Sequence, residues 1–111
     1  MTILPNADRA VIETHKLSGY VLNPAHPQGK HKARVFESVL GLTQADVEIL
    51  RDALQVAVQS EEAVMIDKDR YGVRYQLDFE MTTQTGAAMI RSGWIIRADE
   101  DYPRFVTCYV K

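Results

Sequence analysis

The hydrophobic pattern of this sequence changes its period once, and that change limits the folds that the chain can adopt. Between residues 30 and 60 the apolar residues recur every three or four positions, which is typical of amphipathic helices. Between residues 73 and 110 apolar and polar residues alternate, which is typical of strands with one buried face. Helical signals followed by strand signals predict an α+β protein. Because the chain has 111 residues, we expect a single domain over residues 1–111.

Two amphipathic helices are predicted in the first half of the chain. The first begins at Lys30 and ends before Gly41, which takes the place of a helix-ending residue with positive φ. The second begins at Thr43, whose hydroxyl can cap backbone amides with Asp46 as capping-box partner, and it fades near Ser60. Their apolar stripes consist of Ala33, Phe36 and Leu40, and of Val47, Leu50, Leu54 and Val58. A short helix over residues 15–22, interrupted near Gly19, and a proline-containing loop over residues 23–29 precede them.

Strand signals fill the second half of the chain. A short apolar run over residues 63–66 ends in the polar turn DKDRYG. Strands then follow over residues 73–81, 88–96 and 105–110, separated by the links TTQTG and ADEDYP. Links of this length predict antiparallel pairing. We therefore expect a meander of about four strands, with the N-terminal helices packed on one face of the sheet.

Charge and histidine gather at the N-terminal end of the chain. A net charge of −2 argues against a generic basic nucleic-acid coat protein. Residues 1–34, however, hold five basic side chains, only two acidic ones and all three histidines. Such a segment can form a local anion site, because a phosphate needs only a few converging cations. The alternative is an ordinary solvated surface.

Composition and short sequence patterns argue against a disulfide, a metal or cofactor site, membrane insertion and secretion. Cys108 is the only cysteine, so an internal disulfide is excluded, and its apolar neighbours predict a small buried hydrophobe. The histidines lack HxxH or HxH spacing and no glycine-rich nucleotide loop occurs, so we expect neither a metal nor a cofactor. No apolar stretch approaches the ~20 residues that span a bilayer. The first residues also lack a secretory pattern, so we expect a cytoplasmic protein with no membrane partner.

Three residues are candidates for groups that metal-independent RNA cleavage requires, among them a proton-transfer group and donors that stabilise charge on phosphorus. His26, in the stiff sequence PAHP, is the predicted acid or base; alternatively, its ring only bonds the loop to the body. Lys32 lies in the first turn of its helix, where a cation opposes the helix dipole and can bind phosphate. Thr107 is predicted to hold a phosphoryl oxygen. The further predicted phosphate-binding residues are Lys30, His31 and Arg34.

The last strand carries an aromatic–hydroxyl–aromatic row made of Phe105, Thr107 and Tyr109. If the helices cover the opposite face, this row is open, and Phe105 and Tyr109 can stack nucleotide bases. The row can equally form the core of a homodimer, because exposed apolar patches mark such interfaces. Arg91 and Arg97 share a face of the preceding strand and can extend the row.

Blocks spread over nearly the whole chain resemble a family of small uncharacterised bacterial proteins. These blocks are LPNADRAVI, KLSGYVLNPAHPQGKHKARVF, RYGVRYQLDF, SGWIIR and PRFVTCYV. They are similar to the C-terminal toxin domains of contact-dependent toxins, which share the fold of barnase, colicin D and RelE-type ribonucleases. The resemblance implies helices first and a four-stranded antiparallel sheet after them, which is the order that the periodicity predicts independently.

Two hypotheses about function follow from the sequence. The first is a small RNA-binding or RNA-cleaving domain of the ribonuclease-toxin type, and it requires His26, Lys32 and Thr107 to converge on one cleft. The second is a non-catalytic interaction module, either a homodimer through the open sheet face or an accessory or immunity-type partner. The net negative charge and the lack of a complete catalytic set favour the second.

Overall fold

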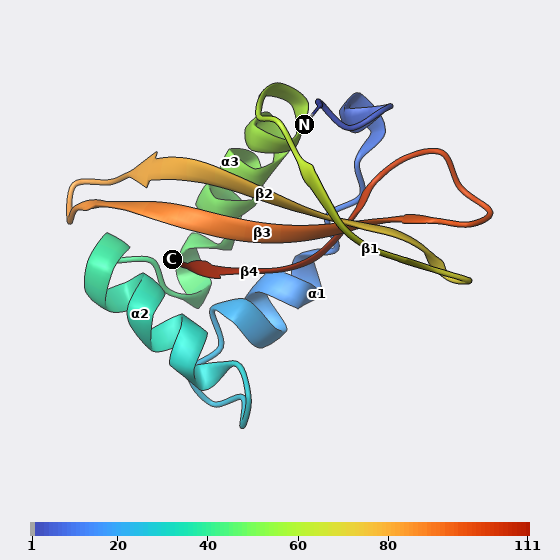
Figure 1. Ribbon diagram of the computed structural model, residues 1–111. Helices are drawn as coiled ribbons and strands as arrows, with labels where there is room; N and C mark the ends of the chain where they lie inside the picture. Colours follow the sequence, from blue (N-terminus) through green and yellow to red (C-terminus); the bar gives the residue numbers. More distant parts are fainter. Residues whose placement is uncertain (1) are drawn as a thin grey trace.

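The elements follow the predicted order of helices and then strands (Figure 1). A computed structural model describes residues 2–111. The helical elements are η1 (Ala7–Arg9), α1 (Thr14–Lys16), the π-helical turn η2 (Leu17–Val21), α2 (Lys30–Leu40), η3 (Gln44–Asp46) and α3 (Val47–Ser60). The strands are β1 (Val64–Asp69), β2 (Gly72–Thr82), β3 (Ala87–Arg97) and β4 (Arg104–Val110). Within residues 2–111, no helix combines the length and apolar character needed to cross a membrane.

The ends of α2 and the start of the next helical segment are fixed by local hydrogen bonds. Gly41 has a φ of 69°, and its amide donates to the Glu37 carbonyl, so the positive φ predicted at this position is confirmed. Thr43 and Asp46 form the predicted capping box. The capped turn is the 3₁₀ segment η3, and α3 follows it directly. The two helices are therefore joined by a tight link whose geometry the sequence encodes locally.

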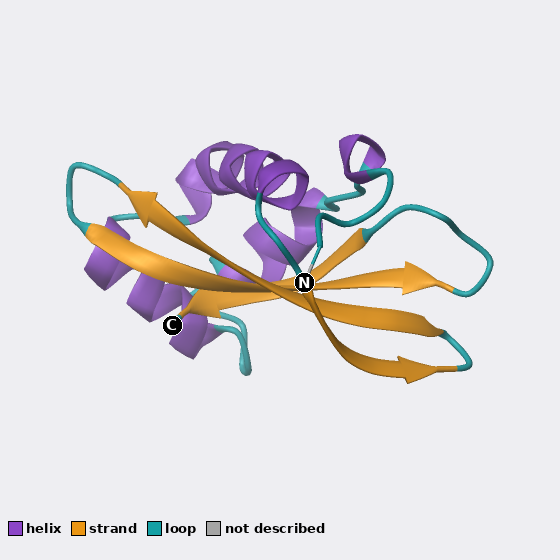
Figure 2. Ribbon diagram, turned by 45° about the horizontal axis from the view of Figure 1, so that its top comes forward, coloured by secondary structure: helices purple, strands orange, loops and turns teal. Residues whose placement is uncertain are grey.

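The four strands form one antiparallel sheet in the order β1-β2-β3-β4, and Figure 2 shows that this layer is strongly twisted. Leu77, Ile90 and Trp94 lie on one face of the sheet and are fully buried in the core. α3 packs on β2, and α2 packs on β3 and β4. The predicted α+β class, with N-terminal helices against a four-stranded antiparallel sheet, is confirmed.

Two linked hydrogen bonds lie in the core. Trp94 is fully buried, and its indole Nε1 donates to the Ser92 hydroxyl at 2.9 Å. Ser92 in turn donates to the Leu77 carbonyl at 2.7 Å. Burial also raises the pKa of the Cys108 thiol, which keeps it protonated and agrees with its expected role as a small hydrophobe.

A bulge in β4 corrects the predicted placement of Phe105. Thr107 pairs with Gly93 and Phe105 pairs with Trp94, so one extra residue, Val106, lies between these pairs. The alternation therefore reverses at Val106, and Phe105 is only 1% exposed, with its ring edge-to-face against Trp94. The expectation that Phe105 lies on the open face beside Thr107, available to stack a base, is wrong.

Two other boundaries differ from the sequence-based expectation. β1 continues through Asp69 into the segment predicted as a turn, because Asp67 and the two residues after it still pair with β2. Every residue of β1 is exposed. The predicted helix over residues 15–22 is a short α-helix followed by a π-helical turn, which runs through Gly19 without a break.

Candidate functional site

The side chain of Lys32 lies between helix α2 and the open face of strand β4. Its Nζ donates to the Thr107 hydroxyl at 3.1 Å and to the Tyr20 hydroxyl at 3.4 Å. The same ammonium lies 4.8 Å from the centroid of the Tyr20 ring and 5.9 Å from that of Tyr109. The structure thus brings Lys32 and Thr107 together, and we call Lys32, Thr107, Tyr20 and Tyr109 the Lys32 site.

The positive charge of Lys32 has no counter-ion in the described part of the chain. Among residues 2–111, no carboxylate oxygen lies within 4 Å of Lys32 Nζ. Hydroxyl oxygens and aromatic faces solvate the half-buried ammonium instead, and both interactions are weaker than a carboxylate contact. An anion such as a phosphate can therefore bind at this site without first displacing an ion-pair partner.

His26 borders the Lys32 site through Tyr20. Its ring meets the Tyr20 ring edge-to-face, with the centroids 4.8 Å apart. His26 Nδ1 accepts hydrogen bonds from the backbone amides of Gln28 and Gly29 at 3.0 and 2.9 Å. These bonds hold the loop against the start of α2, which is the structural role that we considered as the alternative. They also place the hydrogen of the neutral ring on Nε2.

A small hollow opens on the sheet next to the Lys32 site. Its volume is about 160 Å³, and Thr107, Tyr109, Arg91 and Gly93 are among its lining residues. Gly93 pairs with Thr107 across the strands, so the missing side chain leaves space beside the threonine hydroxyl. Tyr109 also lines a second hollow of about 370 Å³ together with Lys32 and His31. The Tyr109 ring is therefore accessible from two sides.

Arg91 is held in place by an ion pair on the open face. Its Nε and Nη2 donate to the two carboxylate oxygens of Asp78, both at 3.0 Å, and Lys111 donates to the same carboxylate at 3.1 Å. These hydrogen bonds, Arg91 first, lower the pKa of Asp78, and the Asp78 carboxylate raises the pKa of Arg91. Arg91 thus stays charged at the border of the hollow.

The three residues predicted to add to phosphate binding do not lie together. His31 lines the same hollow as Lys32. Lys30 and Arg34 are exposed and line a different hollow, which is formed with the segment after α2. The separation follows from the way α2 packs on the sheet, which leaves residues 30 and 34 beside the segment after α2. The structure thus places Lys30 and Arg34 apart from the hollow that His31 and Lys32 line.

The structure adds one aromatic residue, Tyr20, to the site and places one basic residue, Arg97, away from it. Tyr20 was not identified from the sequence, although it contacts both His26 and Lys32. No periodic or motif signal marks it, because its contacts depend on how the loop folds back. Arg97, which was expected to extend the aromatic row, lies instead in a hollow with Arg70 and Tyr71 at the far end of β3.

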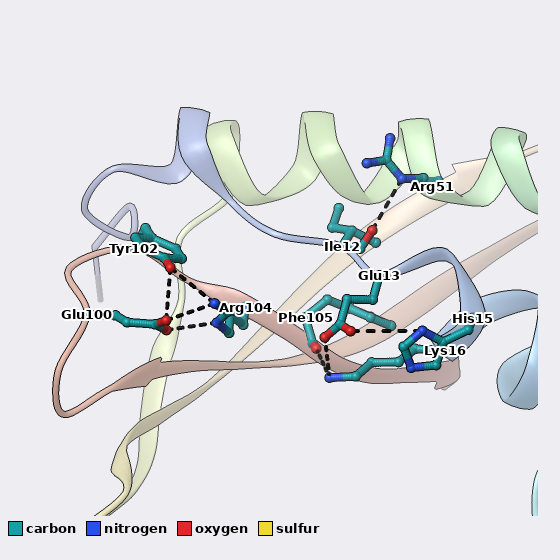
Figure 3. Close-up of polar contacts among 9 residues, drawn as sticks. All are labelled: Ile12, Glu13, His15, Lys16, Arg51, Glu100, Tyr102, Arg104 and Phe105. Carbon is teal, nitrogen blue, oxygen red and sulfur yellow. Dashed lines mark hydrogen bonds and ion pairs between the residues drawn. The ribbon is translucent and has the colours of Figure 1, made fainter.

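A second group of polar contacts fixes the N-terminal segment and the chain link before β4 (Figure 3). Lys16 Nζ donates to the Phe105 carbonyl at 2.9 Å, and Arg51 Nε donates to the Ile12 carbonyl at 3.3 Å. At the other end of the segment drawn, Arg104 makes a bidentate ion pair with Glu100, both bonds at 2.8 Å. Each of these contacts fixes backbone or a chain link, so this cluster stabilises the fold.

The ion pair between Glu100 and Arg104 predicts a specific dependence of stability on pH. Hydrogen bonding, chiefly from Arg104, lowers the pKa of Glu100 from 4.5 to about 2. The stabilisation is therefore present above the ordinary value of 4.5 and is lost as pH falls toward 2. We expect Glu100→Gln to unfold at a lower temperature than the parent chain at pH 7, and this difference to shrink between pH 4.5 and pH 2. Thermal unfolding followed by circular dichroism checks it.

Glu62→Gln is the matched control for this experiment, because Glu62 is exposed and forms no ion pair within residues 2–111. The control is expected to track the parent chain across the whole pH range. If Glu62→Gln and Glu100→Gln show the same pH dependence, the ion pair is not the cause.

The family of the chain is decided by a match over almost its full length. A family model described as a domain of unknown function (DUF6883) matches residues 3–111. The chain belongs to this family. None of the curated protein sequences matches it. Among residues 2–111, no group of three or more histidine, cysteine, aspartate or glutamate side chains is arranged to hold a metal ion.

The fold of this DUF6883 member is similar to one of known structure. It matches a chain in the contact-dependent growth inhibition toxin–immunity protein complex from Klebsiella pneumoniae 342, with a TM-score of 0.73 and 19% sequence identity. The match covers 91% of this chain and 99% of the other. This likeness establishes a shared fold, and the resemblance to contact-dependent toxin systems noted in the sequence agrees with it.

Proposed function

We propose that this chain is a toxin-type domain that binds RNA at the Lys32 site and cleaves it without a metal ion. The observation that carries the proposal is the Lys32 ammonium, which contacts the Thr107 hydroxyl at 3.1 Å, lies over two tyrosine rings and has no carboxylate partner among residues 2–111. A cation, a hydroxyl and aromatic faces are the groups that bind phosphate and stack bases in single-stranded RNA.

Each residue of the site has a defined task in this proposal. The phosphate lies between Lys32 and Thr107, where the ammonium offsets the charge that develops on the phosphoryl oxygens. A base stacks on Tyr109, which is 38% exposed. The hollow over Gly93 takes the phosphate oxygens or the ribose, with Arg91 at its border.

His26 is the proton-transfer group of the proposed reaction. The 2′-oxygen attacks phosphorus and its proton passes to water, the bond from phosphorus to the 5′-oxygen breaks, and the leaving oxygen receives a proton from His26, which regains one from water. Because two amides occupy Nδ1, Nε2 is the nitrogen that takes part. The Tyr20 hydroxyl, which already receives a hydrogen bond from Lys32, is a second donor at the same place.

Incubation of the chain with total tRNA in the presence of EDTA tests this function. We expect a mobility shift and cleavage by the parent chain. Thr107→Val keeps the shape of the side chain but removes the hydroxyl. We therefore expect tRNA binding to weaken about tenfold, which corresponds to the loss of about 1.4 kcal/mol for one hydrogen bond at a charged site. His26→Ala is expected to abolish cleavage and to leave part of the binding intact.

Thr82→Val is the control, because Thr82 is exposed at the far end of β2 and does not touch the Lys32 site. It is expected to behave as the parent chain does. Binding without cleavage would contradict the catalytic part of the proposal. An unaltered tRNA mobility together with intact tRNA would contradict all of it.

A protein-binding role is the second candidate function. The similar structure is a complex between a toxin and an immunity protein, and Met89 and Tyr109 on the open face are 42% and 38% exposed. A homodimer through this face is one form of that role, and an accessory or immunity-type partner is the other. Light scattering on the chain alone distinguishes these two forms, because a homodimer has twice the mass of the chain.

A further inference from the structure

One half of β2 has an edge without a neighbouring strand. β1 pairs with β2 only between Gly72 and Gln76, although β2 continues to Thr82. Among residues 2–111, no backbone group bonds to residues 77–82 on the side away from β3. Figure 1 shows β1 beside only the right-hand half of β2. This stretch therefore presents backbone amides and carbonyls that an added strand can pair with.

An apolar groove of about 430 Å³ follows this free edge between β2 and α3. Four consecutive residues, 79–82, line it although their side chains alternate between the two faces, because the groove runs along the edge itself. The α3 wall consists of Ile49, Ala53 and Val56, spaced by four and three residues on one side of the helix. Ile49 and Val56 are 51% and 66% exposed, so this wall is an apolar surface that the fold leaves in water.

The rim of the groove is acidic. Asp52, Glu61 and Glu80 line it, all three are exposed, and none forms an ion pair with any residue from 2 to 111. Among residues 2–111, no lysine, arginine or histidine lines the groove. A negative rim around an apolar floor matches a ligand with basic and apolar groups side by side.

The outer edges of β4 and β1 each carry one local interruption to strand pairing. At the start of β4, Val11 pairs with Arg104, and Lys16 occupies the Phe105 carbonyl. In β1, the register shifts between Met65 and Asp67, and such a bulge interrupts regular pairing. The edge at residues 77–82 has neither protection, because β2 pairs with β3 in unbroken register up to Thr82.

We propose that this edge groove binds an extended segment of a partner protein in which apolar and basic residues alternate. The segment adds as a strand beside residues 77–82 and pairs with their free backbone groups. Its apolar row packs on the exposed wall of α3 beside Phe79 and Met81, and its basic row, on the other face, meets Glu80. This surface is separate from the Lys32 site, so it does not depend on the proposed RNA function.

A terminally blocked peptide of alternating valine and lysine is the probe that tests this proposal. We expect saturable binding by fluorescence anisotropy and, on binding, at least about tenfold slower hydrogen exchange at those amides of residues 77–82 that point away from β3. The same peptide with alternate backbone nitrogens methylated keeps its charge and side chains but cannot pair as a strand. It is expected to bind at least about tenfold more weakly, which corresponds to 1.4 kcal/mol.

Variants of the chain locate the site. Val56→Lys places a cation on the groove wall and is expected to weaken peptide binding at least about tenfold. Val35→Lys makes the same change on the exposed side of α2, outside the groove, and is expected to leave binding unchanged. Equal binding of the methylated peptide, protection elsewhere than at residues 77–82, or equal effects of both variants would overturn the proposal. So would a dimer of the chain alone that protects these amides, because a second copy would then be the occupant.

Discussion

Replacing Lys32 with methionine is expected to reduce RNA binding about 10- to 100-fold. A hydrogen bond to a charged group contributes about 1.5–3 kcal/mol, which corresponds to a loss of this size. The ammonium has no carboxylate partner among residues 2–111, so no carboxylate of the chain competes with the phosphate for it. Gel-shift titration with tRNA at fixed salt measures the effect, and any cleavage is expected to fall with it.

The fold is expected to tolerate this change. Methionine keeps the aliphatic stem, and its thioether packs well against the Tyr20 and Tyr109 rings that the ammonium faces. A small change in melting temperature would therefore accompany a large change in RNA affinity, and that combination separates a binding role from a structural one.

Lys30→Met is the matched control, because it removes the same charge from the same helix. Lys30 is exposed and lines a hollow on another side of α2. It is expected to change RNA affinity by no more than the general effect of one charge, which salt screens. If both variants lose affinity equally, binding depends on overall charge and the Lys32 site is not the binding site.

Replacing Trp94 with alanine is expected to have the largest effect on stability. Its side chain is fully buried and packs edge-to-face on Phe105. Removing a buried aromatic side chain typically lowers the free energy of unfolding by about 3–5 kcal/mol, out of a total of about 5–15 kcal/mol for a domain. The loss also removes the indole that donates to Ser92. Urea unfolding followed by circular dichroism measures the change.

Tyr71→Ala provides the comparison, because the Tyr71 side chain is 58% exposed. This variant is expected to change the free energy of unfolding by less than about 1 kcal/mol. A loss of that small size for Trp94→Ala would show that the core tolerates a cavity at this position and would contradict the packing described for it.

Part of the fold could be predicted because its signals are local. The end of α2 at Gly41 and the capping box of Thr43 and Asp46 each depend on a few consecutive residues. The strand pattern in β2 likewise repeats along a single stretch of chain. β4 departed from its own pattern because one extra residue, Val106, reverses the alternation, and nothing in the sequence of that strand marks the bulge.

The candidate site could be predicted only in part for the same reason. Lys32 and Thr107 carry the residue types that phosphate chemistry requires, so both were identified, although 75 positions separate them. Tyr20 was missed, since its contacts with His26 and Lys32 form only when the loop over residues 23–29 folds back on it. The separation of Lys30 and Arg34 from His31 likewise depends on how α2 packs on the sheet, which is a tertiary contact.

The sequence by itself determined the class of fold, the order of the elements and the caps of the helices, because periodicity and capping act over a few residues. Only the tertiary structure decided which face β4 gives to Phe105, which aromatic rings surround Lys32 and which half of β2 keeps a free edge. Those features depend on contacts between segments far apart in the chain, and no local pattern encodes such contacts.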